Sequence, residues 1–474
     1  MRGAGLRASY YHDDILRLAQ AKLTGMRNFD SSSDGDKRMA LMAVIDVQLS
    51  LDYEPRREKV QMNEATLVES YMRIAYSIPQ GSEYLRSGYP SEPLLAEAAA
   101  RQLWAWRAKN PSVVVETLTS ILETGVLDRG ELGELTGRLL LLDAYHRAVD
   151  FDQSRRSQES PPNFSAGCRL ITFIQMLFKD AELVLDSRPD NVEGIPFRDA
   201  FKDARVCFTH FGRMTDDTGT RSAVAWAAFV RRMGIICKHG ERIVDFILPI
   251  LMWDAKLCEH VISALLVQLK RREKAGTVAM YSVDEAEINF FPKILEKCTH
   301  GFTGGSLYRP YVSMVMELDV QPRLPGTAQT STIYPWNSAG SKKPPHEERP
   351  RTPPPAESLP HGDTPSKMHI PQHGTLHHPK ETHARYNIFA YGCSPTIYRG
   401  IDEVDKSKYA LLLSSRDFLG EHPRNNEQSL MAVRMMKPFW SGGKACYHWV
   451  DDKNLNGPIS YPPEGLSVEV GMSD

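Results

Sequence analysis

The stretch RIVDFILPILMWDAKLCEHVISALLVQLK, residues 242–270, decides the fold. It holds two apolar runs of strand length, RIVDFILPILMW (242–253) and VISALLVQLK (261–270), joined by the polar turn DAKLCEH. Both runs are nearly continuous in apolar residues, which is typical of strands that are buried on both faces. The stretch therefore predicts two strands inside a sheet that other layers cover.

The flanking sequence extends this pattern in both directions. RPYVSMVMELDV (309–320) and HARYNIFAYG (383–392) read as a third and a fourth strand. Helical patterns lie before, between and after the strands, in RSAVAWAAFVRRMGIICK (221–238), SVDEAEINFFPKILEK (282–297), KYALLLSSRDFL (408–419) and EQSLMAVRMMKPF (427–439). Together they predict an α+β or α/β fold with a mixed sheet that is covered on both faces.

The first 220 residues read as a helical domain. Ser91 is a candidate N-cap for a helix that stops before Asn110-Pro111, and Asp128 for one that runs to about 149. A further helix is expected over 168–185. Gly133 and Gly137 lie four residues apart on the second helix, where each glycine costs up to about 1 kcal/mol relative to alanine, so close packing against a neighbour is expected.

The prolines are unevenly distributed. Residues 322–380 hold 13 of the 31 prolines, with few large apolar side chains, so this segment is expected to be a disordered insertion within one domain. The expected organisation is a helical domain over 1–220, a sheet domain over 221–321 and 381–450, the insertion over 322–380, and a flexible tail over 451–474.

Composition excludes several classes of protein. With 57 basic and 59 acidic residues the net charge is -2, which rules out a chain-wide polycation that coats nucleic acid. The seven cysteines are scattered without paired spacing, which favours free thiols in a reducing compartment. No apolar run approaches the length of a membrane span or a signal peptide, so a cytoplasmic or nuclear protein without a membrane partner is expected.

The two central strands carry the strongest chemical pattern. Asp245 interrupts the first apolar run, and Gln268 and Lys270 end the second, on one face of their strand. Buried charges need partners or a metal. A carboxylate and an amide oxygen can hold Mg²⁺, which activates water and polarises a phosphate, while a lysine orients the water. The pattern predicts metal ligands at Asp245 and Gln268 and a catalytic Lys270.

An acid on one strand followed by (E/Q)-x-K on the next resembles the restriction-endonuclease-like PD-(D/E)xK superfamily. ERIVDFILPIL, ALLVQLK, RPYVSMVMEL, RYNIFAYGCSPTIY and YPSEPLLAEAAARQLW also resemble an expanded family of uncharacterised fungal proteins, similar to the nuclease-like domains of Crinkler-type proteins. This resemblance implies a restriction-endonuclease-like domain, Mg²⁺ and a nucleic-acid partner. Arg271, Arg272 and Lys274 are then candidate phosphate contacts, although a solvated strand end is the plainer interpretation.

The sequence departs from that family in three ways. Residues 221–238 lack the acid often found on the preceding helix, and only Asp216, Asp217 or Glu241 could replace it. Gln268 stands where a carboxylate is usual, and no P-loop accompanies the motif. The alternative is a catalytically inactive interaction module in which Asp245 and Lys270 pair across the sheet.

Three weaker signals accompany the motif. Glu317 could join the metal site, but a surface-facing position is expected. Cys393 is expected in a strand-end turn. The histidines between His361 and His383 are expected in a solvated loop because their spacing is irregular.

Overall fold

The computed structural model places residues up to Leu413 in one compact unit, and residues 414–474 lie outside the described part. The described residues are 2–25, 33–53, 58–77, 85–124, 126–127, 132–154, 161–214, 220–237, 243–253, 257–272, 283–291, 308–320, 332–335 and 382–413.

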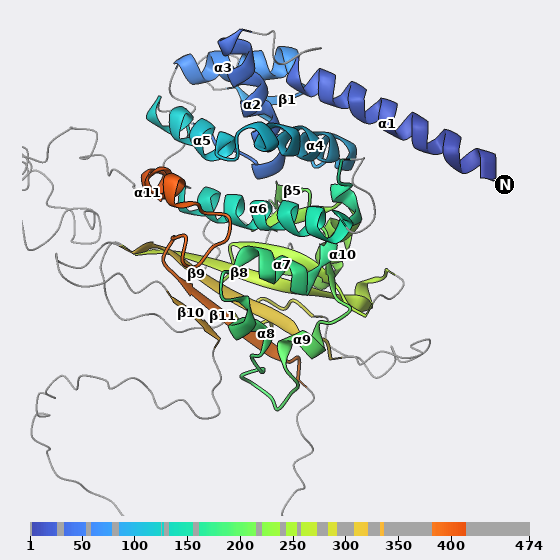
Figure 1. Ribbon diagram of the computed structural model, residues 1–474, viewed down its shortest axis with the longest axis vertical. Helices are drawn as coiled ribbons and strands as arrows, with labels where there is room; N and C mark the ends of the chain where they lie inside the picture. The colour runs from blue at the N-terminus through green and yellow to red at the C-terminus, as the bar shows by residue number, and fades with distance from the viewer. Residues whose placement is uncertain are drawn as a thin grey trace, which may run out of the picture. The chain divides into compact units, whose positions relative to one another are not determined.

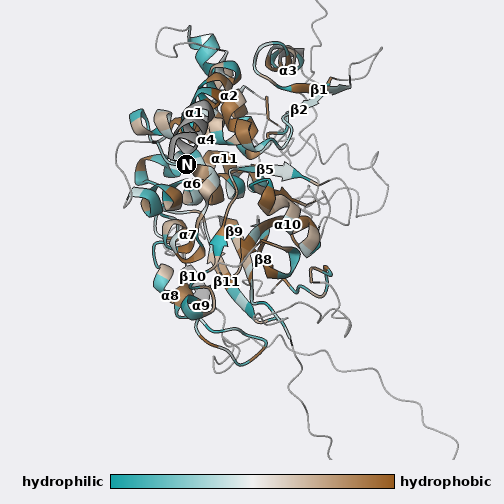
Figure 2. Cartoon of the chain, turned by 90° about the vertical axis from the view of Figure 1, so that its right-hand side faces the viewer, coloured by the Kyte–Doolittle hydropathy of each residue, from teal (hydrophilic) through white to brown (hydrophobic). Residues whose placement is uncertain are grey.

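Helices make up most of the described chain before residue 201, and two further helices come later (Figure 1). They are α1 (Arg2–Thr24), α2 (Asp34–Leu49), α3 (Glu58–Ser70), α4 (Pro93–Lys109), α5 (Val113–Glu123), α6 (Leu132–Ser154), α7 (Leu170–Leu177), α8 (Ala181–Leu185), α9 (Phe197–Ala200), α10 (Ser222–Val230) and α11 (Lys406–Leu413). Local chemistry sets several ends. Ser33 caps α2 by accepting from the Asp36 N–H, and Pro93 occupies the first turn of α4, where its missing N–H is harmless. The buried second half of α2 is largely brown in Figure 2.

The strands form a small sheet and a nine-stranded mixed sheet in the described part of the chain. The small sheet pairs β1 (Ile74–Ser77) with β2 (Arg86–Gly88). The large sheet uses β3 (Cys168–Arg169), β4 (Arg205–Val206), β5 (His210–Arg213), β6 (Met233–Ile236), β7 (Phe246–Leu251), β8 (Ile262–Arg272), β9 (Tyr311–Val320), β10 (Thr332–Pro335) and β11 (Arg385–Tyr391). Its order is β10-β11-β9-β8-β7-β4-β3, with β6 also on β7 and β5 on β6.

The pairing directions make the sheet mixed. β6, β7 and β8 pair antiparallel in succession, whereas β9 pairs parallel to both β8 and β11. β8 and β9 read as continuous apolar runs because both of their faces are covered. The predicted α+β class with a mixed sheet is therefore confirmed.

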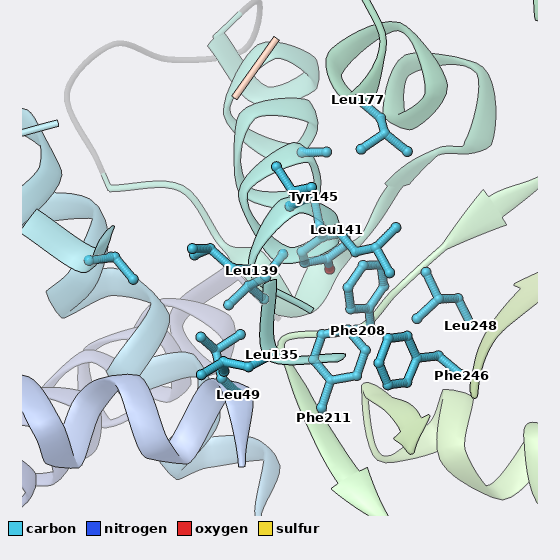
Figure 3. Packing of buried hydrophobic residues seen from close by; sticks show 14 of the residues in the cluster. Leu49, Leu135, Leu139, Leu141, Tyr145, Leu177, Phe208, Phe211, Phe246 and Leu248 are labelled. Atoms are coloured by element: carbon cyan, nitrogen blue, oxygen red, sulfur yellow. The ribbon is translucent and has the colours of Figure 1, made fainter. Parts of the chain in front are cut away.

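The two faces of the sheet pack into different clusters. On the helical face, Val267 and Met314 join the cluster that α6 and α7 complete, and Figure 3 shows side chains of this cluster from α6, such as Leu141, together with the rings of Phe208 and Phe246. On the opposite face, Leu266 packs in a second cluster with Phe229 of α10. The polar side chains described below lie on the same face of the sheet as the second cluster.

Gly137 lets α6 lie directly against β8. A Cβ at Gly137 would stand 2.7 Å from Cδ1 and 2.9 Å from Cδ2 of Leu269. The next residue, Arg138, is buried and donates from Nη1 to the carbonyls of Leu49 (2.5 Å) and Ser50 (2.7 Å) at the end of α2. One turn of α6 therefore ties the helical layer to the sheet, and the close packing expected for this glycine motif is confirmed at Gly137.

Several predicted helices are shorter than expected because strands interrupt them. The helix predicted over 168–185 begins as β3, which pairs with β4, and then divides into α7 and α8. The helix predicted over 221–238 ends at Val230, because Arg232 adopts a positive φ of 58° and β6 begins at Met233. In 282–297, residues 285–289 form a turn, and the part after 291 lies outside the described residues.

Other expectations also changed. Glu92, and not Ser91, caps α4, and α5 was not predicted. β7 begins at Phe246, so Asp245 precedes the strand. Residues 332–335, within the proline-rich insertion, form β10, which pairs with β11. The large sheet draws β3, β4 and β5 from the region before residue 220 and thus crosses the expected boundary. The cap predicted at Asp128, the helix predicted over 427–439 and the 451–474 tail lie outside the described residues.

No helix in the described ranges combines the length and apolar character needed to cross a membrane. The described cysteines, Cys168, Cys207, Cys237, Cys258 and Cys393, are free thiols.

Two buried histidines connect distant segments. His210 of β5 lies 2.8 Å through Nε2 from the Ser91 hydroxyl, and burial together with the nearby Arg231 charge lowers its pKa to about 4. His383 stacks on the Phe291 ring at a centroid distance of 3.7 Å, and burial lowers its pKa to about 4 as well. Both imidazoles are therefore neutral in the folded protein near neutral pH.

Replacing Gly137 by valine is expected to lower the free energy of unfolding by about 1–3 kcal/mol, because the new side chain overpacks against Leu269. Gly133→Val is the control, since Gly133 is only half-buried and lies in the first turn of the same helix. Denaturant unfolding measures both. Equal losses for the two variants would contradict the close contact at Gly137.

Acidification from about pH 6.5 to pH 4 is expected to destabilise the fold. The unfolded histidines take up protons in this window while the folded ones do not, so stability is present above the unfolded pKa and is lost as the pH falls. His210→Gln should flatten part of this slope in a pH series of unfolding midpoints. The exposed His260→Gln is the control, and an unchanged slope in His210→Gln would be the contrary result.

Candidate functional site

Four polar residues occupy the opposite face of the sheet at one end of β7, β8 and β9, and we call them the polar cluster. They are Asp245, Gln268, Lys270 and Glu317. Gln268 and Lys270 lie two residues apart on β8 and so share a face. The ladder between β8 and β9 pairs Lys270 with Glu317, which puts both on that same face. The antiparallel ladder pairs Phe246 with Val267, so its extension sets Asp245 opposite Gln268.

Backbone hydrogen bonds fix Asp245 beside β8. Its N–H donates to the Val267 carbonyl at 2.9 Å, and its own carbonyl accepts from the Cys237 N–H at 2.9 Å. Its carboxylate Oδ2 accepts from the Leu269 N–H at 2.5 Å. Leu269 is the residue between Gln268 and Lys270, so the Asp245 carboxylate is hydrogen-bonded to the backbone at the middle of the Q-x-K motif.

The electrostatics of Asp245 reflect this position. Burial raises the pKa of its carboxyl above the ordinary value, and the Leu269 N–H and the Lys270 charge each pull that pKa down. The ammonium of Lys270 therefore acts on the Asp245 carboxylate, as expected for groups on one face of adjoining strands.

Glu317 is buried, contrary to the surface-facing position expected from the sequence. Its exposed fraction is 3%, and that of Gln268 is 2%. β9 lies between β8 and β11, with both of its faces covered, so neither side of the strand offers a solvent position. Glu317 is the residue that sequence reasoning undervalued, and the continuous apolar run around it was the signal of a strand buried on both faces.

The donor chemistry of the cluster suits a hard cation. Asp245 and Glu317 offer carboxylate oxygens and Gln268 an amide oxygen, which are the ligand types that Mg²⁺ prefers. Within the described ranges, no three His, Cys, Asp or Glu side chains come together as a metal-binding group. A metal at this site would therefore depend on the amide of Gln268 or on water to complete its coordination.

The remaining sequence candidates lie elsewhere. Arg271 and Arg272 belong to the end of β8, after a register irregularity that follows Lys270, while Lys274 lies outside the described residues. So do Asp216, Asp217 and Glu241, the possible substitutes for a helix acid.

The weaker signals divide in the same way. Cys393 lies just after β11 and before the turn at residues 395–397, and the N–H of the preceding Gly392 donates to the Glu317 carbonyl at 2.7 Å. Of the histidine group only His383 is described. It is buried, and its Nδ1 accepts from the Arg309 N–H at 3.0 Å. The prediction of a solvated loop position is therefore wrong for His383.

Removing the Lys270 charge is expected to raise the pKa of Asp245 further, because the ammonium favours the ionised carboxylate. The measurement is a carbon-13 NMR titration of the Asp245 carboxyl in wild type and Lys270→Met. Lys202→Met, at an exposed lysine in the turn before β4, is the control. An Asp245 pKa that does not move in Lys270→Met would contradict the interaction.

Comparison with known proteins gives a family without a named activity. No curated protein matches the chain significantly, and no solved structure does. One family model, described as a domain of unknown function (DUF8736), matches residues 27–285. The matched segment contains Asp245, Gln268 and Lys270, whereas β9 with Glu317 lies beyond it. Because the match covers more than half of the chain, the protein belongs to this DUF8736 family.

Proposed function

We propose that the protein is a Mg²⁺-dependent phosphodiesterase that acts on nucleic acid through the polar cluster. The observation that supports the proposal is the strand register, which sets Asp245 opposite Gln268 and places Lys270 two residues further along the same face of β8. This is the arrangement that the resemblance to the PD-(D/E)xK superfamily implies. The DUF8736 family brings no activity of its own to the argument.

Each residue would have a distinct task. The bound Mg²⁺ would supply Lewis-acid activation of the phosphate and a lower pKa for the attacking water. Asp245 keeps Oδ1 for the cation while Oδ2 holds the Leu269 N–H, so the carboxylate is oriented before any ligand arrives. Gln268 would add its amide oxygen. Lys270 would orient the water and offset negative charge that develops on the phosphate oxygens.

Glu317 strengthens the donor set. Its carboxylate stands on the strand next to β8, in register with Lys270. A carboxylate holds Mg²⁺ more strongly than an amide does, so Glu317 could supply the acid that Gln268 replaces.

One observation favours the non-catalytic alternative. Gln268 and Glu317 are almost fully buried, and Lys270 stands in register with Glu317, as charges do when they pair for stability. In that case the fold would serve as an interaction module. The two functions predict opposite results in a cleavage assay.

The test is Mg²⁺-dependent cleavage of single- and double-stranded DNA and RNA by the full-length protein. We expect cleavage that EDTA abolishes. Asp245→Asn and Lys270→Met are each expected to lower the rate by about 100-fold or more. Asp203→Asn and Lys202→Met are matched controls at exposed positions in the turn before β4 and should keep the wild-type rate.

Unfolding midpoints separate catalysis from folding. Asp245→Asn keeps an oxygen for the Leu269 N–H and removes a charge that burial disfavours, so its stability should equal or exceed that of wild type. A wild-type protein that cleaves none of the substrates, or folded Asp245→Asn with full activity, would overturn the proposal and favour the interaction module.

A further inference from the structure

A second site lies at the β3 edge of the large sheet, where α6 ends and α7 begins. It is a pocket of about 410 Å³, a volume in the range of small-molecule sites. Its lining includes Phe151, Asp152, Gln153, Arg169, Gln175 and Arg205. The site is separate from the polar cluster, because Arg205 pairs with Leu251 at the far end of β7 from Asp245.

Two arginines stand side by side in the lining of this pocket. The antiparallel ladder between β3 and β4 pairs Arg169 directly with Arg205. Side chains of such a pair start about 5 Å apart on the same face, and like charges there repel. Within the described part of the chain neither guanidinium has an ion-pair partner, and Arg205 donates only to the Ala166 carbonyl, at 3.3 Å. An anion between them would relieve the repulsion.

Asp152, the acidic residue of the lining, is already hydrogen-bonded to neighbouring groups. Asp152 accepts from the Arg169 N–H and from the Thr172 hydroxyl, both at 3.0 Å. Two guanidinium charges and one carboxylate leave the lining with a net positive charge. That balance favours an anionic ligand.

The walls of the pocket are fixed before any ligand binds. The Gln153 amide both donates to the Asn163 carbonyl and accepts from the Asn163 N–H, each at 2.8 Å. Together with the Asp152 contacts, this joins the end of α6 to the segments that frame the pocket. A preformed pocket costs little ordering entropy on binding.

We propose that this pocket binds a nucleoside monophosphate. The forked guanidiniums of Arg169 and Arg205 match the oxygens of a terminal phosphate. Phe151, which is 44% exposed at the lining, offers a ring on which a planar base can stack, and Gln175 offers an amide for its polar edge. The volume accommodates a ligand of this size and not only an inorganic ion. The proposal does not depend on the polar cluster.

The test is isothermal titration of the full-length protein with adenosine 5′-monophosphate, adenosine and inorganic phosphate. The monophosphate is expected to bind more tightly than inorganic phosphate, while adenosine should bind at least tenfold more weakly because it lacks the charge. Arg169→Gln and Arg205→Gln should each weaken binding by roughly tenfold or more, and the double variant should abolish it. Phe151→Ala should weaken binding of the monophosphate and leave the affinity for inorganic phosphate unchanged.

Arg221→Gln is the control, since Arg221 is an exposed arginine before α10 and makes no capping bond with its side chain. If the monophosphate does not bind, the proposed nucleotide site is wrong. Binding that survives the double arginine variant would place the ligand elsewhere. Equal affinity for phosphate and the monophosphate would reduce the pocket to an anion subsite and overturn the nucleotide assignment.

Discussion

The approach of α6 to β8 is the contact on which the rest of the unit depends. Gly137 has no side chain, so the backbone of α6 comes close enough to touch Leu269. The N–H of Leu269 in turn holds the Asp245 carboxylate, and the flanking residues are Gln268 and Lys270. Arg138, next to the glycine, binds the end of α2. A single helical turn thus sets the position of the Q-x-K strand relative to every layer above it.

The sequence predicted the parts of the fold that long patterns encode. β7, β8, β9 and β11 were found because each is rich in β-branched, aromatic and other apolar residues over strand length, and α4 because its 3.6-residue period ends at a proline. β3 and β6 were absorbed into predicted helices, because strands of two to four residues have no measurable period and their existence depends on partners far along the chain. The local strand propensity of a short segment does not indicate which distant strand it will pair with.

The candidate sites show the same division. Asp245, Gln268 and Lys270 stand out as charged or polar residues within apolar strands, so pattern alone could single them out. Glu317 was placed on the surface although the apolar run around it is typical of a strand that is buried on both faces. The Arg169–Arg205 pair could not be foreseen, since the two arginines are 36 positions apart in the sequence and only the β3–β4 register brings them together.

The placement of β11 has a consequence for synthesis on the ribosome. β9 can pair with β11 only after residues 385–391 emerge, and α11 then reaches back to α5 and α6, where Lys408 pairs with Glu116 at 2.8 Å and Asp405 accepts from Ser112 at 2.7 Å. Until that moment the nascent chain exposes the edge of β9, a long apolar strand with unpaired backbone groups. Such an edge is a template for association with other chains. The unit therefore closes late in synthesis, because its last central strand and the contacts with α5 come from the end of the described chain.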